Sequence, residues 1–134
     1  DMRTVVRRAE LSLDSDLQPD PDLFVRAAQG ALAMADLPLA DRLADAAIRA
    51  GAGAEANYIR GHAISWLGRG EEADLVFAAS PTDGFTDADR ARLTYLRASN
   101  ILLALGDAPR AKALVRYTTA RQSPTSSSAD NAGN

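Results

Sequence analysis

Four side chains suited to contacting a ligand follow one another at helical spacing, namely Tyr58, His62, Ser65 and Trp66. Steps of four, three and one residues separate them, so a helix would place all four on one face. Two aromatic rings beside a histidine can bind an extended peptide or a small ligand. Alternatively, the rings pack against a neighbouring helix pair, since aromatic side chains at helical spacing more often belong to a core.

Catalytic chemistry finds no support in the motifs of the chain. The sequence has no Gly-x-x-x-x-Gly-Lys-Ser/Thr loop, no His-Glu-x-x-His and no Gly-x-Ser-x-Gly, and its single histidine, His62, rules out sites that need two. The adjacent carboxylates Glu71 and Glu72 would point in different directions on a helix, which does not suit an acid–base pair. The sequence also lacks cysteine. We therefore expect no catalytic residues, no metal and no cofactor.

The composition is typical of a small cytoplasmic protein. The chain has 134 residues, of which 46% are hydrophobic and only 5% aromatic, and this length suits one domain. A net charge of −3 argues against general affinity for nucleic acids, which depends on surplus positive charge. No window approaches the roughly 18 apolar residues that a membrane span needs. Among the 15 basic residues only Lys112 is a lysine, and this bias, with the abundance of alanine, indicates a bacterial origin.

A short phrase that recurs three times indicates how the chain is organised. It reads Ala31-Leu32-Ala33-Met34-Ala35-Asp36, then Ile64-Ser65-Trp66-Leu67-Gly68-Arg69, then Leu102-Leu103-Ala104-Leu105-Gly106-Asp107. Ala40, Ala73 and Ala111 follow the three phrases at intervals of 33 and 38 residues. Repeats of this size are stacked helical pairs, because one pair cannot bury its apolar face alone.

Hydrophobic periodicity and capping signals predict the elements that carry these residues. A helix is expected over residues 1–13 and an acidic, proline-containing linker over 14–21. Three helix pairs are expected within residues 22–121, at 22–35 with 38–50, 54–67 with 71–79, and 87–105 with 109–120. Thr86 and Asp89 have the spacing of a capping box. Residues 122–134 lack apolar periodicity, so a disordered tail is expected there.

The three units resemble the tetratricopeptide repeat, in which an aromatic residue opens the first helix, a small residue follows, and alanines mark the second helix. The matching residues are Phe24, Ala28, Ala40 and Ala47, then Gly61, Ala73 and Phe77, then Tyr95, Ser99 and Ala111. The second unit departs from the pattern, with Asn57 in place of the opening aromatic. The resemblance implies an all-α, right-handed stack of about three antiparallel helix pairs, an α-solenoid preceded by the last helix of an earlier repeat.

The same resemblance implies roles for individual side chains. Small residues would let paired helices touch at Ala28, Gly61, Ala40, Ala73 and Ala111. The first helices of such a stack line a concave groove, which here would present Arg26, Gln29, Tyr58, His62, Ser65, Trp66, Arg97 and Asn100. Its arginines would favour an extended peptide or a small ligand with negative groups.

The alanine-rich and arginine-rich phrases at residues 67–73 and 105–111 are similar to the helical-repeat region of bacterial ATP-dependent regulators of the LuxR and MalT type. In those proteins an ATPase module precedes the repeats and a helix-turn-helix follows. The resemblance implies a non-catalytic module that binds a protein, a peptide or a small ligand, contacts neither nucleic acid nor membrane, and can form a homo-oligomer. A structural spacer or self-association module is the alternative, and a small enzyme is a third interpretation.

Overall fold

The computed structural model describes residues 1–15 and 20–122, and every regular element in this part of the chain is an α-helix. The helices are α1 (Met2–Leu13), α2 (Pro21–Ala33), α3 (Leu37–Arg49), α4 (Ala54–Trp66), α5 (Gly70–Ala78), α6 (Asp87–Leu103) and α7 (Ala108–Gln122). The predicted all-α fold class is confirmed. Residues 16–19 of the expected linker and 123–134 of the expected tail lie outside the described residues. None of the described helices combines the length and apolar character needed to cross a membrane.

Side-chain caps determine where several helices begin. The Asp36 carboxylate accepts a hydrogen bond from the backbone N–H of Leu39 at 3.2 Å, and Pro38 lies in the first turn of α3, where its missing N–H costs little. At α6 the Thr86 hydroxyl accepts from the N–H of Asp89 at 3.1 Å, and the Asp89 carboxylate accepts from the N–H of Thr86 at 2.9 Å. This reciprocal pair confirms the predicted capping box.

The recurring phrase ends each first helix in a turn with a left-handed residue, although the third turn is one residue longer after the C-cap than the first two. Ala35, Gly68 and Gly106 hold equivalent places in the phrase, and their φ angles of 59°, 83° and 64° are all left-handed. Glycine adopts this conformation freely, whereas it costs an alanine about 1–2 kcal/mol. The repeat seen in the sequence therefore corresponds to a shared left-handed turn residue, and the first two turns also share their hydrogen bonds, from Asp36 to Ala31 and from Arg69 to Ile64.

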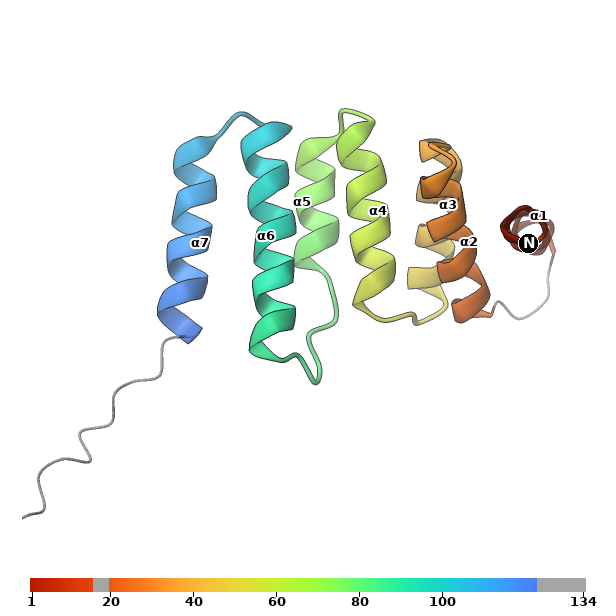
Figure 1. Cartoon of the computed structure of the whole chain (residues 1–134), viewed down its shortest axis with the longest axis horizontal. Helices are drawn as coiled ribbons and strands as arrows, with labels where there is room; N and C mark the ends of the chain where they lie inside the picture. Colours follow the sequence, from red (N-terminus) through yellow and green to blue (C-terminus); the bar gives the residue numbers. More distant parts are fainter. Residues whose placement is uncertain (16–19, 123–134) are drawn as a thin grey trace, which may run out of the picture.

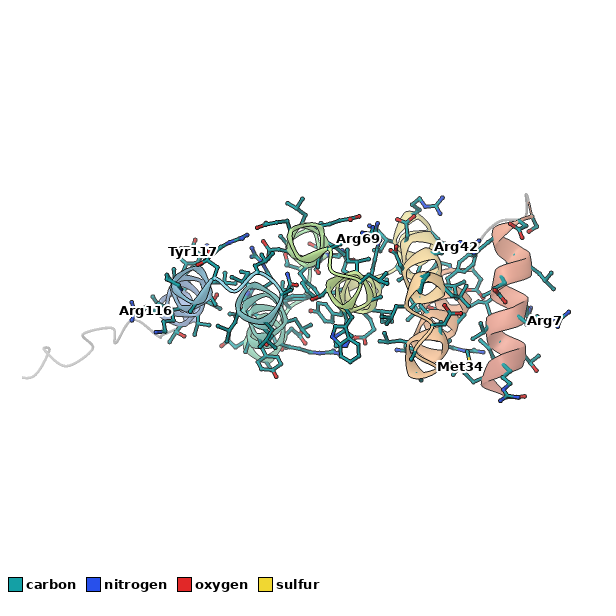
Figure 2. All side chains as sticks on the ribbon, turned by 90° about the horizontal axis from the view of Figure 1, so that it is seen from above. Arg7, Met34, Arg42, Arg69, Arg116 and Tyr117 are labelled. Carbon is teal, nitrogen blue, oxygen red and sulfur yellow. The ribbon has the colours of Figure 1, made fainter. Side chains whose placement is uncertain are left out.

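Helices α2 to α7 lie side by side, each packed against the next (Figure 1). α4 also contacts α2, and α6 also contacts α4, so the first helices of the three pairs touch one another. α1 contacts α2 and α3 and lies across one end of the row; it is seen end-on in Figure 1 and along its length in Figure 2. The expectation that α1 is the last helix of an earlier repeat stays a prediction.

Small side chains dominate the core. Ala28 and Ala40 are fully buried in a cluster that joins α1, α2, α3 and α4. A second cluster joins α4, α5 and α6 and includes Ala73 and Phe77. Gly61 of α4 lies directly against the Phe77 ring, because a Cβ on Gly61 would come within 2.7 Å of ring atoms. Close approach of α4 and α5 thus requires a residue without a side chain at position 61.

The last helix contributes little to either cluster. In the described part of α7, Ala111 is the one buried hydrophobic side chain, while Val115 and Tyr117 are exposed. Apolar surface therefore remains open at the α7 end of the row.

Candidate functional site

The first helices of the second and third pairs enclose a cleft of about 380 Å³, here called the α4–α6 cleft. Its lining comprises His62, Ser65 and Trp66 of α4, Phe77 of α5, and Tyr95, Leu96, Ser99, Asn100, Leu103 and Ala104 from α6 and its C-cap. Half of the eight residues predicted for the groove thus come together here, namely His62, Ser65, Trp66 and Asn100.

The walls of the α4–α6 cleft are large apolar side chains that remain exposed. Trp66 is 68% exposed, Tyr95 70% and Leu103 82%. Trp66 is the last residue of α4 and Leu103 the last of α6. The His62 ring lies one turn before Trp66, with the two ring centroids 4.8 Å apart and the planes tilted by 39°. Aromatic rings held in this way offer a large contact area at a low entropic cost.

Two polar residues tie the base of the cleft together. The Ser65 hydroxyl donates to Oδ1 of Asn100 at 2.7 Å, and Nδ2 of Asn100 donates to the carbonyl of Gly70 at 2.8 Å. Asn100 is buried, so its amide groups are used in joining α4, α5 and α6. The prediction that Asn100 presents its side chain to a ligand is corrected, because both of its polar ends already have partners within the protein.

Tyr58 does not form an exposed shelf with Trp66, which corrects a second expectation. It is only 7% exposed, and the guanidinium of Arg92 from α6 lies 4.8 Å from the centroid of its ring. Burial raises the pKa of the Tyr58 hydroxyl, although the positive charge of Arg92 acts in the opposite direction. Tyr58 therefore belongs to the packing between α4 and α6. For this ring, the alternative interpretation, that it packs against a neighbouring helix pair, describes the structure.

Arg97 is also unavailable in the way the resemblance implies. Its Nε donates to Oδ1 of Asp74 at 2.9 Å, and Nη2 of Arg110 donates to Oδ2 of the same carboxylate at 3.1 Å. The Asp74 side chain is buried, so two arginines share one desolvated partner. The ion pair between Arg97 and Asp74 joins α6 to α5, and Arg97 does not line the α4–α6 cleft.

Arg26 and Gln29 lie elsewhere on the molecule. Neither lines the α4–α6 cleft, and both belong to α2, at the other end of the row from α6. The continuous groove predicted across all three first helices is therefore reduced to a shorter cleft between two of them. Its surface is mainly apolar, with His62 as the one basic side chain among the described lining residues.

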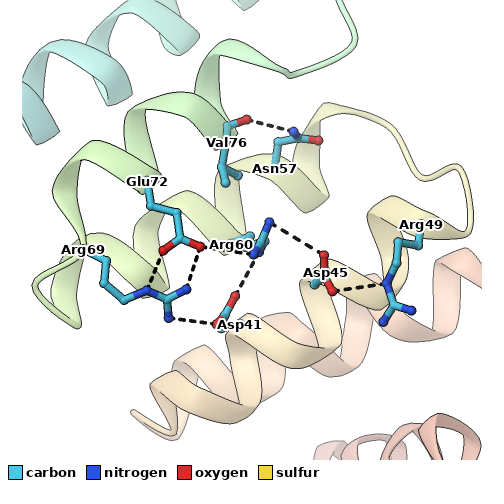
Figure 3. A network of polar contacts seen from close by, with 8 residues as sticks. All are labelled: Asp41, Asp45, Arg49, Asn57, Arg60, Arg69, Glu72 and Val76. Atoms are coloured by element: carbon cyan, nitrogen blue, oxygen red, sulfur yellow. Dashed lines mark hydrogen bonds and ion pairs between the residues drawn. The ribbon is translucent and has the colours of Figure 1, made fainter.

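A second polar network joins α3, α4 and α5 (Figure 3). Arg60 contacts Asp41 at 2.9 Å and Asp45 at 3.7 Å. Arg69 contacts Glu72 at 2.7 Å and Asp41 at 3.2 Å. The hydrogen bond between Arg69 and Glu72 raises the pKa of the arginine and lowers that of the carboxyl group. These ion pairs link neighbouring helices, so the charged residues in this network have a structural role.

The arrangement of the α4–α6 cleft suits noncovalent contact. Among the described residues no group of three or more His, Asp or Glu side chains could hold a metal ion. His62 faces Trp66, an uncharged ring, and the nearest polar lining groups are hydroxyls and an amide. The cleft can therefore enclose apolar side chains and donate a few hydrogen bonds.

Sequence reasoning missed Tyr95 and Ser99 as cleft residues, because the repeat pattern assigns both to packing positions. A signal for their role exists in the spacing of residues 95, 99 and 103, which places Tyr95, Ser99 and Leu103 on one face of α6. The face alone would not have shown that α4 supplies the opposite wall.

Comparison of the chain with protein-family models, with curated proteins and with solved structures gives no significant match. The fold defines an all-helical protein whose helices pack in sequential pairs. Its function must therefore be inferred from the α4–α6 cleft itself.

Proposed function

We propose that this chain is a tetratricopeptide-like, right-handed helical stack that acts as a non-catalytic interaction module, and that the α4–α6 cleft binds apolar side chains of a partner peptide. The repeated left-handed turns and the contacts among α2, α4 and α6 support this type of stack. The observation that carries the binding proposal is the wall of exposed side chains formed by Trp66, Tyr95 and Leu103.

The chemistry of the cleft indicates which ligands it favours. Aromatic anchors in a concave site usually supply most of the binding energy of an interface. Because Arg97 is paired with Asp74 and Arg26 lies outside the cleft, neither of these predicted arginines is available there for an anionic ligand. We therefore infer that the partner inserts leucine-like or aromatic side chains, with Ser99 and His62 available for hydrogen bonds from its backbone.

In the wider proposal the module is the sensor region of a bacterial cytoplasmic transcription regulator of the LuxR and MalT type. The support is the alanine-rich and arginine-rich sequence of the repeats at residues 67–73 and 105–111. Self-association is a second candidate function, favoured by the very high exposure of Leu103, which a second copy of the chain could cover.

Selection of phage-displayed random peptides on the immobilised chain tests the binding proposal. Recovered peptides should be rich in large apolar residues, and Trp66→Ala should weaken their binding at least about tenfold, as for a hot-spot residue. Leu75→Ala is the matched control, because Leu75 is as exposed as Tyr95 but lies on α5 outside the cleft.

Intrinsic fluorescence supplies an independent readout, since Trp66 is the only tryptophan. The free chain should show the red-shifted, easily quenched emission of a solvated indole, and bound peptide should shift it to the blue. Peptides that bind wild-type protein and Trp66→Ala equally would refute the cleft proposal. A dimer in sedimentation velocity that Trp66→Ala dissociates would favour self-association instead.

A further inference from the structure

A second apolar surface lies between α6 and α7 and shares Tyr95 and Ser99 with the α4–α6 cleft. This α6–α7 groove has a volume of about 560 Å³. Leu102 of α6 and Ala111 and Val115 of α7 contribute to its apolar surface, and Lys112 and Arg116 are the charged side chains among its described lining residues. Tyr95 forms a ridge between this groove and the α4–α6 cleft, because it lines both.

Equivalent positions earlier in the row are covered by the next helix pair. The helix-ending hydrogen bonds make Ile101 the counterpart of Ala31 and Ile64, and all three are buried. In the same register Tyr95 is the counterpart of Tyr58, which is 7% exposed, whereas Tyr95 is 70% exposed. Val115 of α7 corresponds to Phe77 of α5, which is buried in the core. Val115 itself is 44% exposed. The α6–α7 groove thus repeats a surface that receives a helix at two other places in the same molecule.

The charges at the groove are inverted relative to those earlier sites. Lys112 occupies the position of Asp41 and Asp74, and Arg116 occupies that of Asp45. At the first site Asp41 and Asp45 both contact Arg60 of the next first helix, α4. At the second site Asp74 contacts Arg97 of α6. In each case the helix that covers the surface brings an arginine to an aspartate.

Lys112 and Arg116 have no ion-pair partner among the described residues. A helix that covers the groove must therefore bring carboxylates to the place where α4 and α6 bring arginines, since opposite charges are needed for the same contact. Apolar residues along one side would cover Leu102 and Val115.

We propose that the α6–α7 groove docks an amphipathic α-helix of a partner, with an apolar stripe flanked by glutamate or aspartate that pairs with Lys112 and Arg116. A second copy of this chain stacked end to end does not fit this description. The outer helix at the other end, α1, carries exposed Arg3, Arg7 and Arg8 against one carboxylate of its own, Glu10, so it is net basic. Figure 2 shows Arg7 and Arg116 at opposite ends. Arginines would then face Lys112 and Arg116.

A peptide taken from the chain itself provides the probe. Residues 86–104 form α6 with its own capping box, which favours helix formation in the isolated peptide. One fluorescein-labelled version keeps the native Arg97, and a second carries the substitution Arg97→Glu, so the two differ only in the charge that faces the partner helix. Fluorescence polarisation measures the binding of both to wild-type protein and to the double variant Lys112→Glu/Arg116→Glu.

The Arg97→Glu peptide should bind wild-type protein about fivefold more tightly than the native peptide, and the order should reverse for the double variant, as expected for partly exposed ion pairs. Val115→Asp should weaken both peptides, while Trp66→Ala should leave both affinities unchanged because Trp66 does not line this groove. Absence of saturable binding, equal affinities for the two peptides, or loss of binding in Trp66→Ala would overturn the proposal. A dimer of the wild-type chain that Val115→Asp dissociates would also overturn it, by making a second copy the occupant.

Discussion

Replacing Gly61 by alanine should destabilise the protein, although alanine is the better helix former. A Cβ at position 61 would lie 2.6 Å from Cζ and 2.7 Å from Cδ1 of Phe77, well inside the roughly 3.5–4.0 Å at which carbon atoms attract one another. Phe77 borders the α4–α6 cleft but is only 2% exposed and packs in the cluster that joins α4, α5 and α6, so moving its ring would disturb other core contacts.

Two opposing contributions set the size of this effect. Removing a glycine from a helix interior stabilises by about 0.5–1 kcal/mol, whereas forcing an extra carbon into a packed core costs about 1–3 kcal/mol. Overpacking exceeds the gain in helix propensity, so the free energy of unfolding of Gly61→Ala should fall by about 0.5–2 kcal/mol.

Gly30→Ala is the matched control. Its Cβ would meet the thioether of Met2, an exposed, flexible side chain at the start of α1 that can move aside. It would also lie 3.1 Å from a methyl carbon of buried Val6, a milder contact than the one between Gly61 and Phe77. Here the gain in helix propensity should offset most of the cost of these contacts, so Gly30→Ala should be clearly more stable than Gly61→Ala.

Urea unfolding followed by far-UV circular dichroism measures these differences. Phe77→Leu should lose stability through a cavity, but in combination with Gly61→Ala the smaller side chain makes room for the new methyl group. The loss in the double variant should therefore be smaller than the sum of the two separate losses, by about 0.5 kcal/mol or more. Additive losses, or a Gly61→Ala variant as stable as Gly30→Ala, would show that the contact with Phe77 does not limit the packing of α4 on α5.

Four further substitutions, one of them with a matched control, test other features of the fold. Ala35→Gly should raise the free energy of unfolding by about 1 kcal/mol, because the left-handed φ of 59° is strained for alanine. The same change at Ala113, which is exposed inside α7, should lower the free energy of unfolding by about as much. A change of the same sign at both sites would contradict this reasoning. Asp74→Asn should lower stability by about 1–3 kcal/mol, since two arginines lose a charged acceptor, and a neutral result in urea unfolding would mean that these ion pairs contribute nothing net. Thr86→Ala should cost about 1 kcal/mol and increase amide hydrogen exchange at the start of α6; exchange unchanged there would exclude the cap as a determinant of this end. The backbone N–H of Thr86 lowers the pKa of Asp89 in the folded state, so its stabilisation is present above about pH 4 and is lost as the pH falls through that lowered pKa. Asp89→Asn should remove this part of the acid dependence, and an identical acid profile in the variant would contradict it.

Local signals were sufficient to predict the helices. The prolines, aspartates and glycines at the chain reversals act within a few residues of one another, so the positions of α2 to α7 could be read from the sequence to within about two or three residues. The same is true of the capping box of Thr86 and Asp89. The orientation of α1 could not be predicted in this way, because it depends on how one helix meets the side of two others.

The same distinction between local signals and tertiary packing applies to the candidate site. The sequence by itself determined that Tyr58, His62, Ser65 and Trp66 share one face of a helix, since that follows from a period of about 3.6 residues. Only the tertiary structure decided that Tyr58 is covered by Arg92 while Trp66 remains open, because helical periodicity states the direction of a side chain and not how far the neighbouring helix extends over it. Asn100 and Arg97 likewise found partners 30 and 23 residues away in sequence, at Gly70 and Asp74. Such pairings arise from the stacking of helix pairs, and no local pattern specifies them.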